Sequence, residues 1–490
     1  MAGGWVRDKL LGRECKDVDV ALDDMLGREF AERLCEFLEL RGGADAARGV
    51  HVIQANPDQS KHLETATMRV HGLELDLVNL RSEKYAEDSR IPEMAFGTAE
   101  EDALRRDLTI NALFYNINTR TVEDLTGRGI DDLRAGVART PLPPRTTFLD
   151  DPLRVLRAVR FAARYGFALD AELEAAAGLP EVRQALASKV SRERFGVELN
   201  GMLKGPGPEG AVRAMARLGV LPEVFAAPGA DPEWCTDNII PGGEARMSEA
   251  CAAAVEVCMA ALAAWGEGAA LSGAERRVAA LAAALLPLRG YEVRVKKKPT
   301  PLSQQIVAAG VKLPSKDAKD VAHLHAHADE FAVLLPRLVQ GAGSDAAAAA
   351  GDHVGTLRVA VGKLVKAAGP QWRVALLLGA VAAQRGAGAA LARGDDVDAG
   401  SAAAGAGQDD AEVAACSCAQ AAATVTGMGL ERAFELKPLL DGRAIMQATG
   451  AKGKDVGQIM AKAFEWQLAR PEATAEEARA WVVDTYTAAK

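Results

Sequence analysis

The sequence predicts an α+β fold in which strands are confined to the N-terminal part and helices form the rest. Strand-like segments occur early, at 16–20, at 50–55, and in the pair 66–70 and 73–80 that flanks a His-Gly turn. Residues 206–340 are rich in alanine and leucine, and only 5% of the chain is aromatic. Because alanine and leucine favour helices and aromatic residues favour strands, most of the chain is predicted to be helical.

The first element is a glycine turn at Gly3 and Gly4, followed by a helical segment, WVRDKLL. Two glycines let the backbone come close to a bulky anion, and the helix that follows turns its positive end toward the same place. This pattern predicts a turn that binds a phosphate group.

The next element is a strand that carries two carboxylates on one face. Residues 16–20 alternate, so that Asp17 and Asp19 share a face while Val18 and Val20 point to the core. Two neighbouring carboxylates repel each other unless a cation lies between them, and Mg²⁺ favours carboxylate and phosphate oxygens. Asp76, in the second strand of the predicted hairpin, is a candidate third carboxylate. Each feature alone is typical of a solvated strand end, but together with the glycine turn they predict metal-dependent phosphoryl or nucleotidyl transfer.

A polar stretch at 82–104, interrupted by Pro92 and Gly97, predicts a mobile loop over this site. Arg106 follows it and opens a predicted helix over 108–117. Arg106 is a candidate contact to a phosphate or a ribose. The alternative is a structural ion pair with Asp107.

The stretch 150–167 (DDPLRVLRAVRFAARYGF) predicts a helix with a basic stripe. Pro152 suits a first helical turn, so Asp151 could simply be an N-cap. At 100° per residue, the stripe falls within about a third of the helix circumference. It comprises Arg154, Arg157, Arg160 and Arg164.

Asp151 and Arg154 lie one turn apart, and together they match the hydrogen-bonding edges of two bases. A carboxylate accepts from the amine of C or A, and a guanidinium donates to their ring nitrogens. U and G present a ring N–H to the guanidinium and would be rejected, by about 1–3 kcal/mol for a good pair of contacts. Arg157 and Arg160 are predicted to contact the triphosphate or to hold this pair in place. The alternative is an amphipathic helix with solvated arginines.

The charge and cysteine content restrict the remaining options. The net charge of -9 means that contact with nucleic acid requires a local basic surface. Seven scattered cysteines without a C-x-x-C pair predict free thiols rather than disulfides or zinc. Apolar runs fall short of the ~18 residues that span a bilayer, so no membrane association is predicted. The histidines of HLHAH (323–327) are predicted to be structural, and the Ala/Gly-rich stretches 341–352 and 386–415 to be disordered insertions.

Several blocks of this sequence resemble one family, the class II tRNA nucleotidyltransferases, or CCA-adding enzymes, of the polymerase-β-like superfamily. The blocks occur in family order over about the first 205 residues, and the C-terminal segment from LLDGRAIMQATG onward resembles the tail of eukaryotic, plant-like members. The matching blocks are GGWVRDKLLGRECKDVDV, LELDLVNLRSEKY, EEDALRRDLTINALFYN, DLTGRGIDDLRAG, DDPLRVLRAVRFAARYGF and SRERFGVELNGML.

The resemblance implies a small mixed-sheet nucleotidyltransferase head followed by an elongated all-α neck, body and tail. The expected domains are 1–140 (catalytic head), 141–205 (neck, base recognition), 206–385 (helical body), 386–420 (Ala/Gly-rich low-complexity insert) and 421–490 (helical tail that contacts tRNA).

The resemblance also implies the activity: template-independent addition of CCA to the 3′ end of tRNA from CTP and ATP, with Mg²⁺ as cofactor and no obligate protein partner. Poly(A) polymerase activity and a truncated, non-catalytic RNA-binding homologue are the alternatives. The expected location is the cytoplasm, or the mitochondrion, nucleus or a plastid if an N-terminal extension is missing. Carried over by position, the resemblance assigns Asp17, Asp19 and Asp76 to catalysis, with Asp17 and Asp19 binding the metal, and Gly3, Gly4, Arg7, Arg106, Asp151, Arg154, Arg157 and Arg160 to the nucleotide.

The sequence departs from the family pattern in two places. Family members usually have a strand before the glycine turn, whereas only Met1 and Ala2 precede it here, which would fit an incomplete chain. The usual Glu-Asp pair before the base-recognition arginine is Asp150-Asp151, which keeps the second, base-contacting carboxylate.

Overall fold

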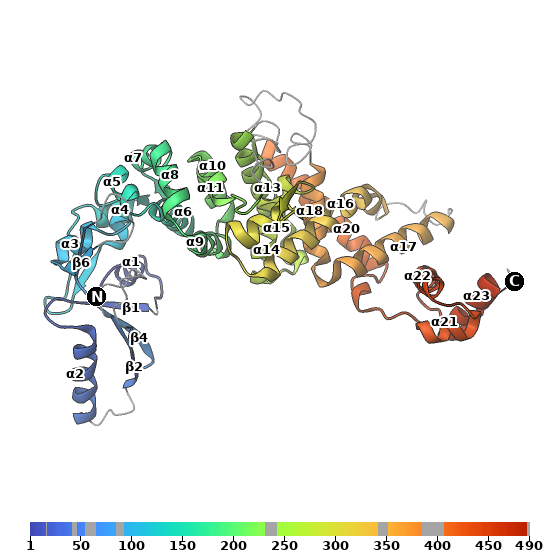
Figure 1. The fold of residues 1–490 in the computed structure, drawn as a ribbon, viewed down its shortest axis with the longest axis horizontal. Coiled ribbons are helices and arrows are strands. Elements are labelled where there is room, and N and C mark those ends of the chain that lie inside the picture. Colours follow the sequence, from blue (N-terminus) through green and yellow to red (C-terminus); the bar gives the residue numbers. More distant parts are fainter. Residues whose placement is uncertain are drawn as a thin grey trace. The chain divides into compact units, whose positions relative to one another are not determined.

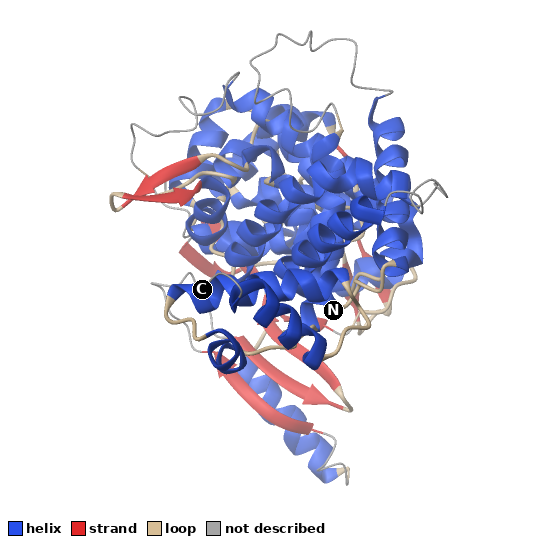
Figure 2. Ribbon diagram, turned by 90° about the vertical axis from the view of Figure 1, so that its right-hand side faces the viewer, coloured by secondary structure: helices blue, strands red, loops and turns tan. Residues whose placement is uncertain are grey.

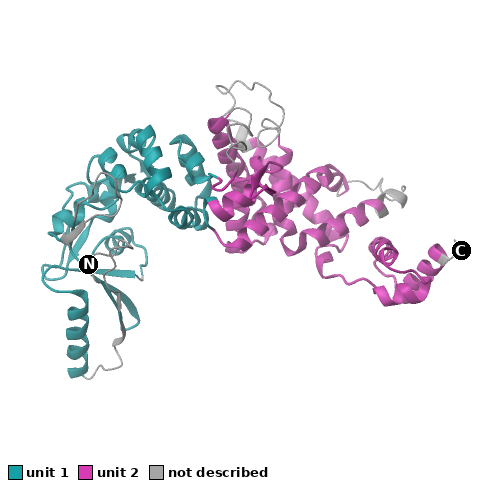
Figure 3. Cartoon of the chain, viewed as in Figure 1, with its two compact units in different colours: residues 1–226, 310–312 teal, residues 227–309, 313–490 magenta. Residues whose placement is uncertain are grey.

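The computed structural model describes residues 1–15, 17–41, 47–53, 65–84, 93–230, 243–341, 351–384 and 406–487. The chain forms two compact units, residues 1–226 with 310–312 and residues 227–309 with 313–490 (Figures 1 and 3). The first unit contains every site residue predicted from the sequence.

The head contains the predicted mixed sheet, with strand order β1-β4-β3-β2. β1 pairs with β4 in parallel, whereas β3 pairs with both β4 and β2 in antiparallel fashion. One face of the sheet packs on helix α2 (Gly27–Leu40) through a core that includes Val18, Leu77 and Ala31. The predicted hairpin is confirmed, since His71 and Gly72 form its two-residue turn with φ angles of 47° and 82°. The strands are β1 (Asp17–Leu22), β2 (Ala47–Ile53), β3 (Thr65–Val70) and β4 (Leu73–Asn79).

The first two residues pair with the strands on both sides of them. Ala2 bridges to Asp19 of β1 and to Phe114 of β7 (Phe114–Asn116). The amide of Tyr115 donates to the carbonyl of Met1 over 2.9 Å. Met1 and Ala2 therefore connect the sheet to the small hairpin of β7 and β8 (Thr121–Glu123).

Two predictions for residues 82–117 need correction. Both ends of the predicted loop are ordered, because β5 (Arg81–Lys84) pairs with β6 (Glu93–Phe96) and α3 (Ala99–Leu104) follows with a capping box. The centre of the loop, 85–92, lies outside the described residues. The predicted helix over 108–117 is wrong. A short 3₁₀ turn at Thr109–Asn111 leads into β7, because the backbone of 114–116 pairs with β8 instead of with its own preceding turn.

Helices cover the rest of the first unit. α6, predicted from the stretch 150–167, buries Leu153, Leu156 and Val159. It is capped at its C-terminus by Gly166, which has the left-handed conformation with φ 72°. Arg192 donates to the carbonyls of Gly310, Glu223 and Val224, which attaches residues 310–312 to this unit. The further elements are α1 (Gly4–Leu10), α4 (Gly129–Ala135), β9 (Val137–Ala138), α5 (Pro144–Asp150), α6 (Leu153–Tyr165), β10 (Ala168–Leu169), α7 (Ala171–Ala177), α8 (Pro180–Lys189), α9 (Arg192–Lys204), α10 (Pro208–Arg217) and α11 (Leu221–Val224).

The second unit is built mainly from long apolar helices. α16 packs closely on α18 at Gly379 of α18, where there is no room for a side chain. A Cβ at this position would lie 2.7 Å from the carbonyl oxygen of Ala328 on α16. Among the described residues, Gly243–Ala269 is long and apolar enough to cross a membrane, but 61% of its most apolar window is buried inside the unit. The main helices are α13 (Gly243–Trp265), α14 (Gly273–Ala284), α15 (Leu302–Gln305), α16 (Ser315–Gly341), α17 (Gly351–Ala368) and α18 (Trp372–Ala383).

The predicted insert at 386–420 is wrong in its second half. α20 (Ala406–Gly427) packs on α13, and its Ala414, Cys418 and Val425 are fully buried. Small side chains allow two helices to approach closely, so the alanine-rich composition reflects tight packing here and not disorder. Residues 386–405 and 342–350, also predicted to be disordered, lie outside the described residues.

Two smaller features complete the second unit. A short hairpin of β11 (Glu292–Val295) and β12 (Lys298–Pro301) departs from the predicted all-helical body. Near the C-terminus, α21 (Gly442–Thr449), α22 (Lys454–Ala469) and α23 (Ala475–Thr487) share a separate core around Ile445 and Val482. His325 has the structural role predicted for HLHAH, since it is buried in the helical core and bonds to the carbonyl of Ala282, whereas His323 is exposed and bonds to the carbonyl of Ala368.

Candidate active site

The glycine turn is shaped by the side chain of Arg106. Gly3 has φ 63° and ψ -123°, and its amide donates to the carbonyl of Leu113 over 2.8 Å. A Cβ at Gly3 would lie 2.5 Å from Nη1 of Arg106 and 3.3 Å from the carbonyl oxygen of Asn111. Both the left-handed backbone and the close approach therefore require glycine at this position.

The predicted carboxylates lie side by side on one face of the sheet. In the parallel register of β1 and β4, Asp19 is the direct partner of Asp76, and Asp17 is the partner of Glu74. The hydroxyl of Thr67, on β3, donates to Oδ1 of Asp76 over 2.7 Å. Adjacent strands thus bring together residues that are almost sixty positions apart in sequence.

The charges at this edge are only partly compensated. Burial raises the pKa of Asp19, the carboxylates of Asp76 and Asp17 raise it further, and the Arg106 and Arg81 guanidiniums oppose the shift. Among the described residues, no group of three or more His, Cys, Asp or Glu side chains forms a metal site by itself. Mg²⁺, however, is usually held by one or two carboxylates together with substrate phosphates and water. The hard oxygen donors of Asp19 and Asp76 therefore fit such an ion when a nucleotide brings the remaining ligands.

The side chain of Arg106, which lies against the glycine turn, is held by Asp102 and Asn111. Its Nη2 donates to Oδ2 of Asp102 over 2.8 Å, and its Nη1 donates to the carbonyl of Asn111 over 2.9 Å. Burial alone would raise the pKa of Asp102, but Arg106 and Arg105 outweigh it and hold that pKa below its usual value. The structural ion pair of Arg106 is made with Asp102 and not with Asp107, the partner considered from the sequence.

Asp151 lies at the junction of α5 and α6, where it accepts two hydrogen bonds from Arg194 of α9. Nη1 and Nη2 of Arg194 donate to Oδ1 and Oδ2 of Asp151 over 3.2 and 2.7 Å. Oδ1 also accepts from the amide of Leu153 over 3.3 Å. The carboxylate of Asp151 is thus held at a helix start and by a guanidinium from another helix.

The arginines of α6 have partners on several elements. Nη2 of Arg154 donates to the carbonyl of Arg105 over 2.7 Å, and only 8% of this residue is exposed. Arg157 donates to Oδ2 of Asp107 over 2.6 to 2.7 Å. Arg160 pairs with Glu198 of α9 over 2.5 Å.

These pairs set the side-chain direction of the basic stripe. Arg157 and Arg160 sit against buried acids of neighbouring elements, so the interpretation of α6 as a helix with freely solvated arginines is wrong for them. The Arg157 guanidinium holds the pKa of the buried Asp107 below its usual value, although burial alone would raise it.

Arg7 points into the interior of the first unit. Only 4% of it is exposed, and its guanidinium lies over the Phe161 and Tyr165 rings, 5.1 and 4.6 Å from their centroids. Its Nε donates to Asp8, and its Nη1 donates to Oδ1 of Asn111. The Tyr165 hydroxyl donates to Asp8 over 2.8 Å. Arg7 thus binds α1 to α6, and it shares Asn111 with Arg106.

The acids and the arginine that fix this arrangement were not predicted from the sequence. Arg194 and Glu198 belong to a block already identified by resemblance, SRERFGVELN, but received no role. Asp102 lies in the stretch predicted to be a loop. The signal that could have found them is the excess of arginine over acid around α6, since buried guanidiniums need carboxylate partners.

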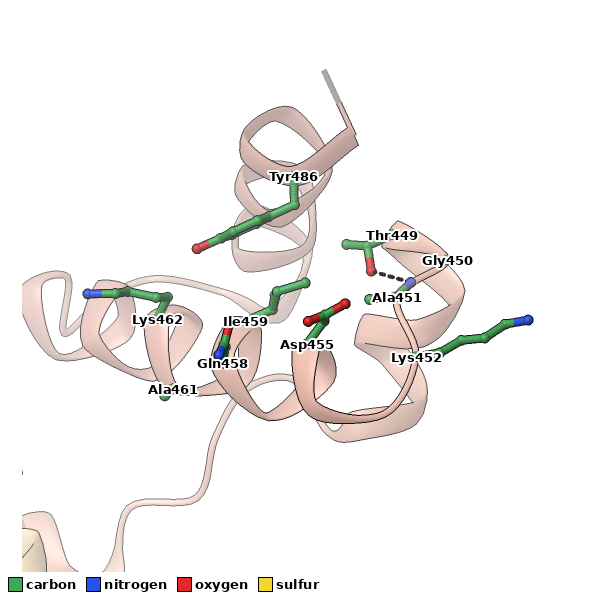
Figure 4. A pocket seen from close by; sticks show the side chains of 10 residues that line it. All are labelled: Thr449, Gly450, Ala451, Lys452, Asp455, Gln458, Ile459, Ala461, Lys462 and Tyr486. Atoms are coloured by element: carbon green, nitrogen blue, oxygen red, sulfur yellow. Dashed lines mark hydrogen bonds between the residues drawn. The ribbon is translucent and has the colours of Figure 1, made fainter. Parts of the chain in front are cut away.

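A pocket of about 870 Å³ lies in the second unit, among the C-terminal helices (Figure 4). Its lining includes Lys452, Asp455, Lys462 and Tyr486, and one wall is closed by a bond from the amide of Ala451 to the Thr449 hydroxyl. None of the residues predicted for catalysis or nucleotide binding lines it.

Comparison with known proteins identifies the family. Residues 1–139 match the family described as the poly A polymerase head domain. The chain is 31% identical to tRNA nucleotidyltransferase cca2 of Schizosaccharomyces pombe over 486 residues, which cover 98% of this chain and 91% of that protein. The chain belongs to the tRNA nucleotidyltransferase family. Membership in this family suggests a divalent metal ion as cofactor.

Other tRNA nucleotidyltransferases match part of the chain more closely. The mitochondrial CCA tRNA nucleotidyltransferase of Saccharomyces cerevisiae is 53% identical over 227 residues, which span 46% of this chain and 42% of that protein. The fold agrees with solved structures at low identity. The Thermotoga maritima CCA-adding enzyme complexed with tRNA has a TM-score of 0.56 at 19% identity, covering 99% of this chain and 90% of that one. The Bacillus stearothermophilus enzyme in complex with CTP has a TM-score of 0.57 at 19% identity, covering 100% and 93%.

Proposed function

We propose that this tRNA nucleotidyltransferase adds C, C and A to the 3′ end of tRNA from CTP and ATP and releases pyrophosphate, with Mg²⁺ as the metal ion. The observation that carries the proposal is the pairing of Asp19 with Asp76 on adjacent strands beside the Gly3 turn. Family membership supports the reaction class, and the nucleotide and tRNA complexes described for structural neighbours support these substrates.

The residues of the head would prepare the two reacting groups. Asp17, Asp19 and Asp76 would hold the metal, which when bound neutralises the triphosphate and increases the acidity of the tRNA 3′-hydroxyl. A phosphate of the nucleotide would lie at the turn of Gly3 and Gly4, where the missing side chain of Gly3 lets the Arg106 guanidinium approach the backbone. The guanidinium of Arg106, fixed between Asp102 and Asn111, would place positive charge next to that phosphate.

Base selection would come from the first turn of α6. Asp151, held by Arg194, would accept from the exocyclic amine of C or A. Arg154, oriented by its bond to the Arg105 carbonyl, would donate to the ring nitrogen. Arg157 and Arg160 would support this pair through Asp107 and Glu198. Arg7 would contribute by fixing α1 against α6, because its guanidinium is buried against the Phe161 and Tyr165 rings.

The test is incorporation of CMP and AMP into a tRNA that lacks its CCA end. Asp19→Ala should reduce the rate by about 1,000-fold or more, since the carboxylate acts on the charge that develops in the transition state. Glu74→Gln is the matched control, because Glu74 lies on the same strand face two residues from Asp76 and is exposed. Its rate should stay close to that of the wild type.

Metal binding has its own measurement, Mn²⁺ binding followed by electron paramagnetic resonance in the presence of CTP. Asp19→Ala should lose this binding, while Glu74→Gln should keep it. An active Asp19→Ala variant would overturn the metal assignment.

The same assay separates the alternatives. Incorporation of AMP alone, in long tails, would indicate a poly(A) polymerase, an activity named for a Salmonella typhi relative that is 37% identical over 175 residues. Binding of tRNA without incorporation would indicate a non-catalytic RNA-binding homologue. The Saccharomyces cerevisiae and Candida glabrata relatives are named as mitochondrial enzymes, which supports the mitochondrion as the location of this protein.

A further inference from the structure

The hairpin of β11 and β12 is anchored in the second unit at its base. Val293 is 2% exposed and Leu302, directly after β12, is fully buried. The amide of Leu302 donates to the carbonyl of Tyr291 over 2.8 Å, which closes the base of the hairpin. Figure 2, with helices in blue and strands in red, shows how few strands accompany the helices. The hairpin therefore presents its turn from a fixed base.

The turn itself consists of two lysines in an unfavourable backbone conformation. Val295 pairs with Lys298, so that Lys296 and Lys297 form a two-residue turn with φ angles of 49° and 66°. Such turns need a positive φ at both positions and strongly favour Asn-Gly, which adopts it with little strain. Side chains kept at a backbone cost are a reason to look for a function that needs them.

The charge of the turn points to the partner. Lys296, Lys297 and Lys298 are all exposed, as is Arg294 on β11. In the part of the chain that the structure describes, none of the three lysines forms a salt bridge. These four cations lie within a stretch of five residues, although the net charge of the whole protein is -9. A protein with that overall charge attracts RNA only through such local surfaces.

We infer that the turn of this hairpin, Lys296 to Lys298, binds the phosphate backbone of the tRNA substrate. The inference rests on the proposed function, because tRNA is the RNA that the proposed reaction requires. The lysines act as point charges on phosphates, so they contribute affinity without base specificity. They take no part in selecting or joining the nucleotide.

The structure allows a variant that removes the charge without disturbing the turn. Lys296→Asn with Lys297→Gly removes two cations and installs the dipeptide that this turn prefers. The variant should be folded at least as stably as the wild type. Its affinity for tRNA at about 0.1 M salt should fall by about tenfold, and the slope of log affinity against log salt should fall by about two. The KM for tRNA should rise, while the KM for CTP and kcat at saturating tRNA should not change.

Two further variants make the result specific. Lys316→Gln with Lys319→Gln removes the same charge from exposed positions of α16 and should leave tRNA affinity near that of the wild type. Lys296→Arg with Lys297→Arg keeps the charge and should also keep the affinity. In addition, tRNA should protect Lys296 to Lys298, but not Lys316, from acylation as measured by mass spectrometry.

The inference is overturned if the Asn-Gly variant binds tRNA with unchanged affinity and salt slope, or if the α16 control loses as much affinity. Failure of the proposed function looks different. A wild-type protein that binds tRNA but incorporates no nucleotide would refute the proposed reaction, and the hairpin would still be judged by its effect on binding.

Discussion

The two units have different interiors. In unit 1, where α1, α6 and residues 102–111 meet, the buried side chains include Arg7, Asp102, Asp107, Arg154 and Glu198. In unit 2, around α13, α18 and α20, the interior is almost entirely apolar. Apart from cysteines, the buried titratable side chains in the described part of unit 2 are Asp317 and His325.

This difference separates two tasks. Hydrogen bonds and ion pairs depend on direction, so a charged interior fixes the orientation of each side chain around the proposed site. Apolar contacts have no preferred direction and stabilise a shape mainly through close packing. Unit 1 uses the first kind where chemistry is proposed, and unit 2 uses the second kind to build a scaffold.

His325 is an exception to the apolar interior of unit 2, because it is a buried group that can take up a proton. Its protonation gives the largest expected effect on stability. Burial lowers the pKa of His325 to about 4, and Arg289 adds to this, while the bond to Ala282 and the Asp329 carboxylate oppose it. A folded pKa below the unfolded value of about 6.5 means that stability is lost as the pH falls from 6.5 toward 4. Between pH 7 and pH 5, the free energy of unfolding should fall by about 2 kcal/mol.

Urea unfolding at the two pH values checks this expectation. His325→Leu removes the titrating group and should show a smaller loss of unfolding free energy over the same interval. Equal losses in both proteins would mean that His325 does not titrate in this range.

Arg194 tests the charged interior of unit 1. Arg194→Ala removes both bonds to Asp151 and should lower the preference for CTP over UTP, measured as the ratio of kcat/KM values, by about tenfold. Asp151→Ala should lower it at least as much. The control is Arg145→Ala, which breaks an exposed ion pair between α5 and α8 and should leave the preference unchanged. Unaltered selectivity in Arg194→Ala would show that Asp151 needs no support from α9.

Gly379 tests the close packing of unit 2. Gly379→Ala places a methyl group against the backbone of α16 and should lower the free energy of unfolding by about 1–2 kcal/mol. Gly457→Ala, in α22, meets no atom within 4 Å and should instead be neutral or stabilising, by up to about 1 kcal/mol. Thermal unfolding of the two variants compares them directly. Destabilisation of both would point to a general intolerance of glycine replacement.

The sequence predicted the local elements well, because their signals are local. The glycine turn, the alternation of Asp17 to Val20 and the His71-Gly72 hairpin each follow from backbone preferences of a few residues. The pairing of Asp19 with Asp76 was predicted only as sharing a site. Its register depends on which strands become neighbours, which the chain does not state locally.

The errors arose where tertiary contacts decide. Residues 108–117 have helical spacing, yet Tyr115 pairs with Met1, and 114–116 form a strand after a short 3₁₀ turn. α20 was taken for an insert because alanine gives little contrast between a buried and an exposed face. The partner of Arg106 was also misjudged. Asp107 is its direct neighbour in sequence, but the fold places Asp102, four residues earlier, against its guanidinium.

The bond from Arg154 to the carbonyl of Arg105 has a mechanical consequence. Arg105 precedes Arg106 directly, so the group proposed to sense base identity and the group proposed to sit beside the phosphate are attached to one rigid peptide unit. If the Arg154 guanidinium moves when a purine replaces a pyrimidine in the site, this peptide unit would move with it. Recognition of the base and alignment of the phosphate would then be coupled, so that a nucleotide with the wrong base would also hold its phosphate in a poor position for the reaction.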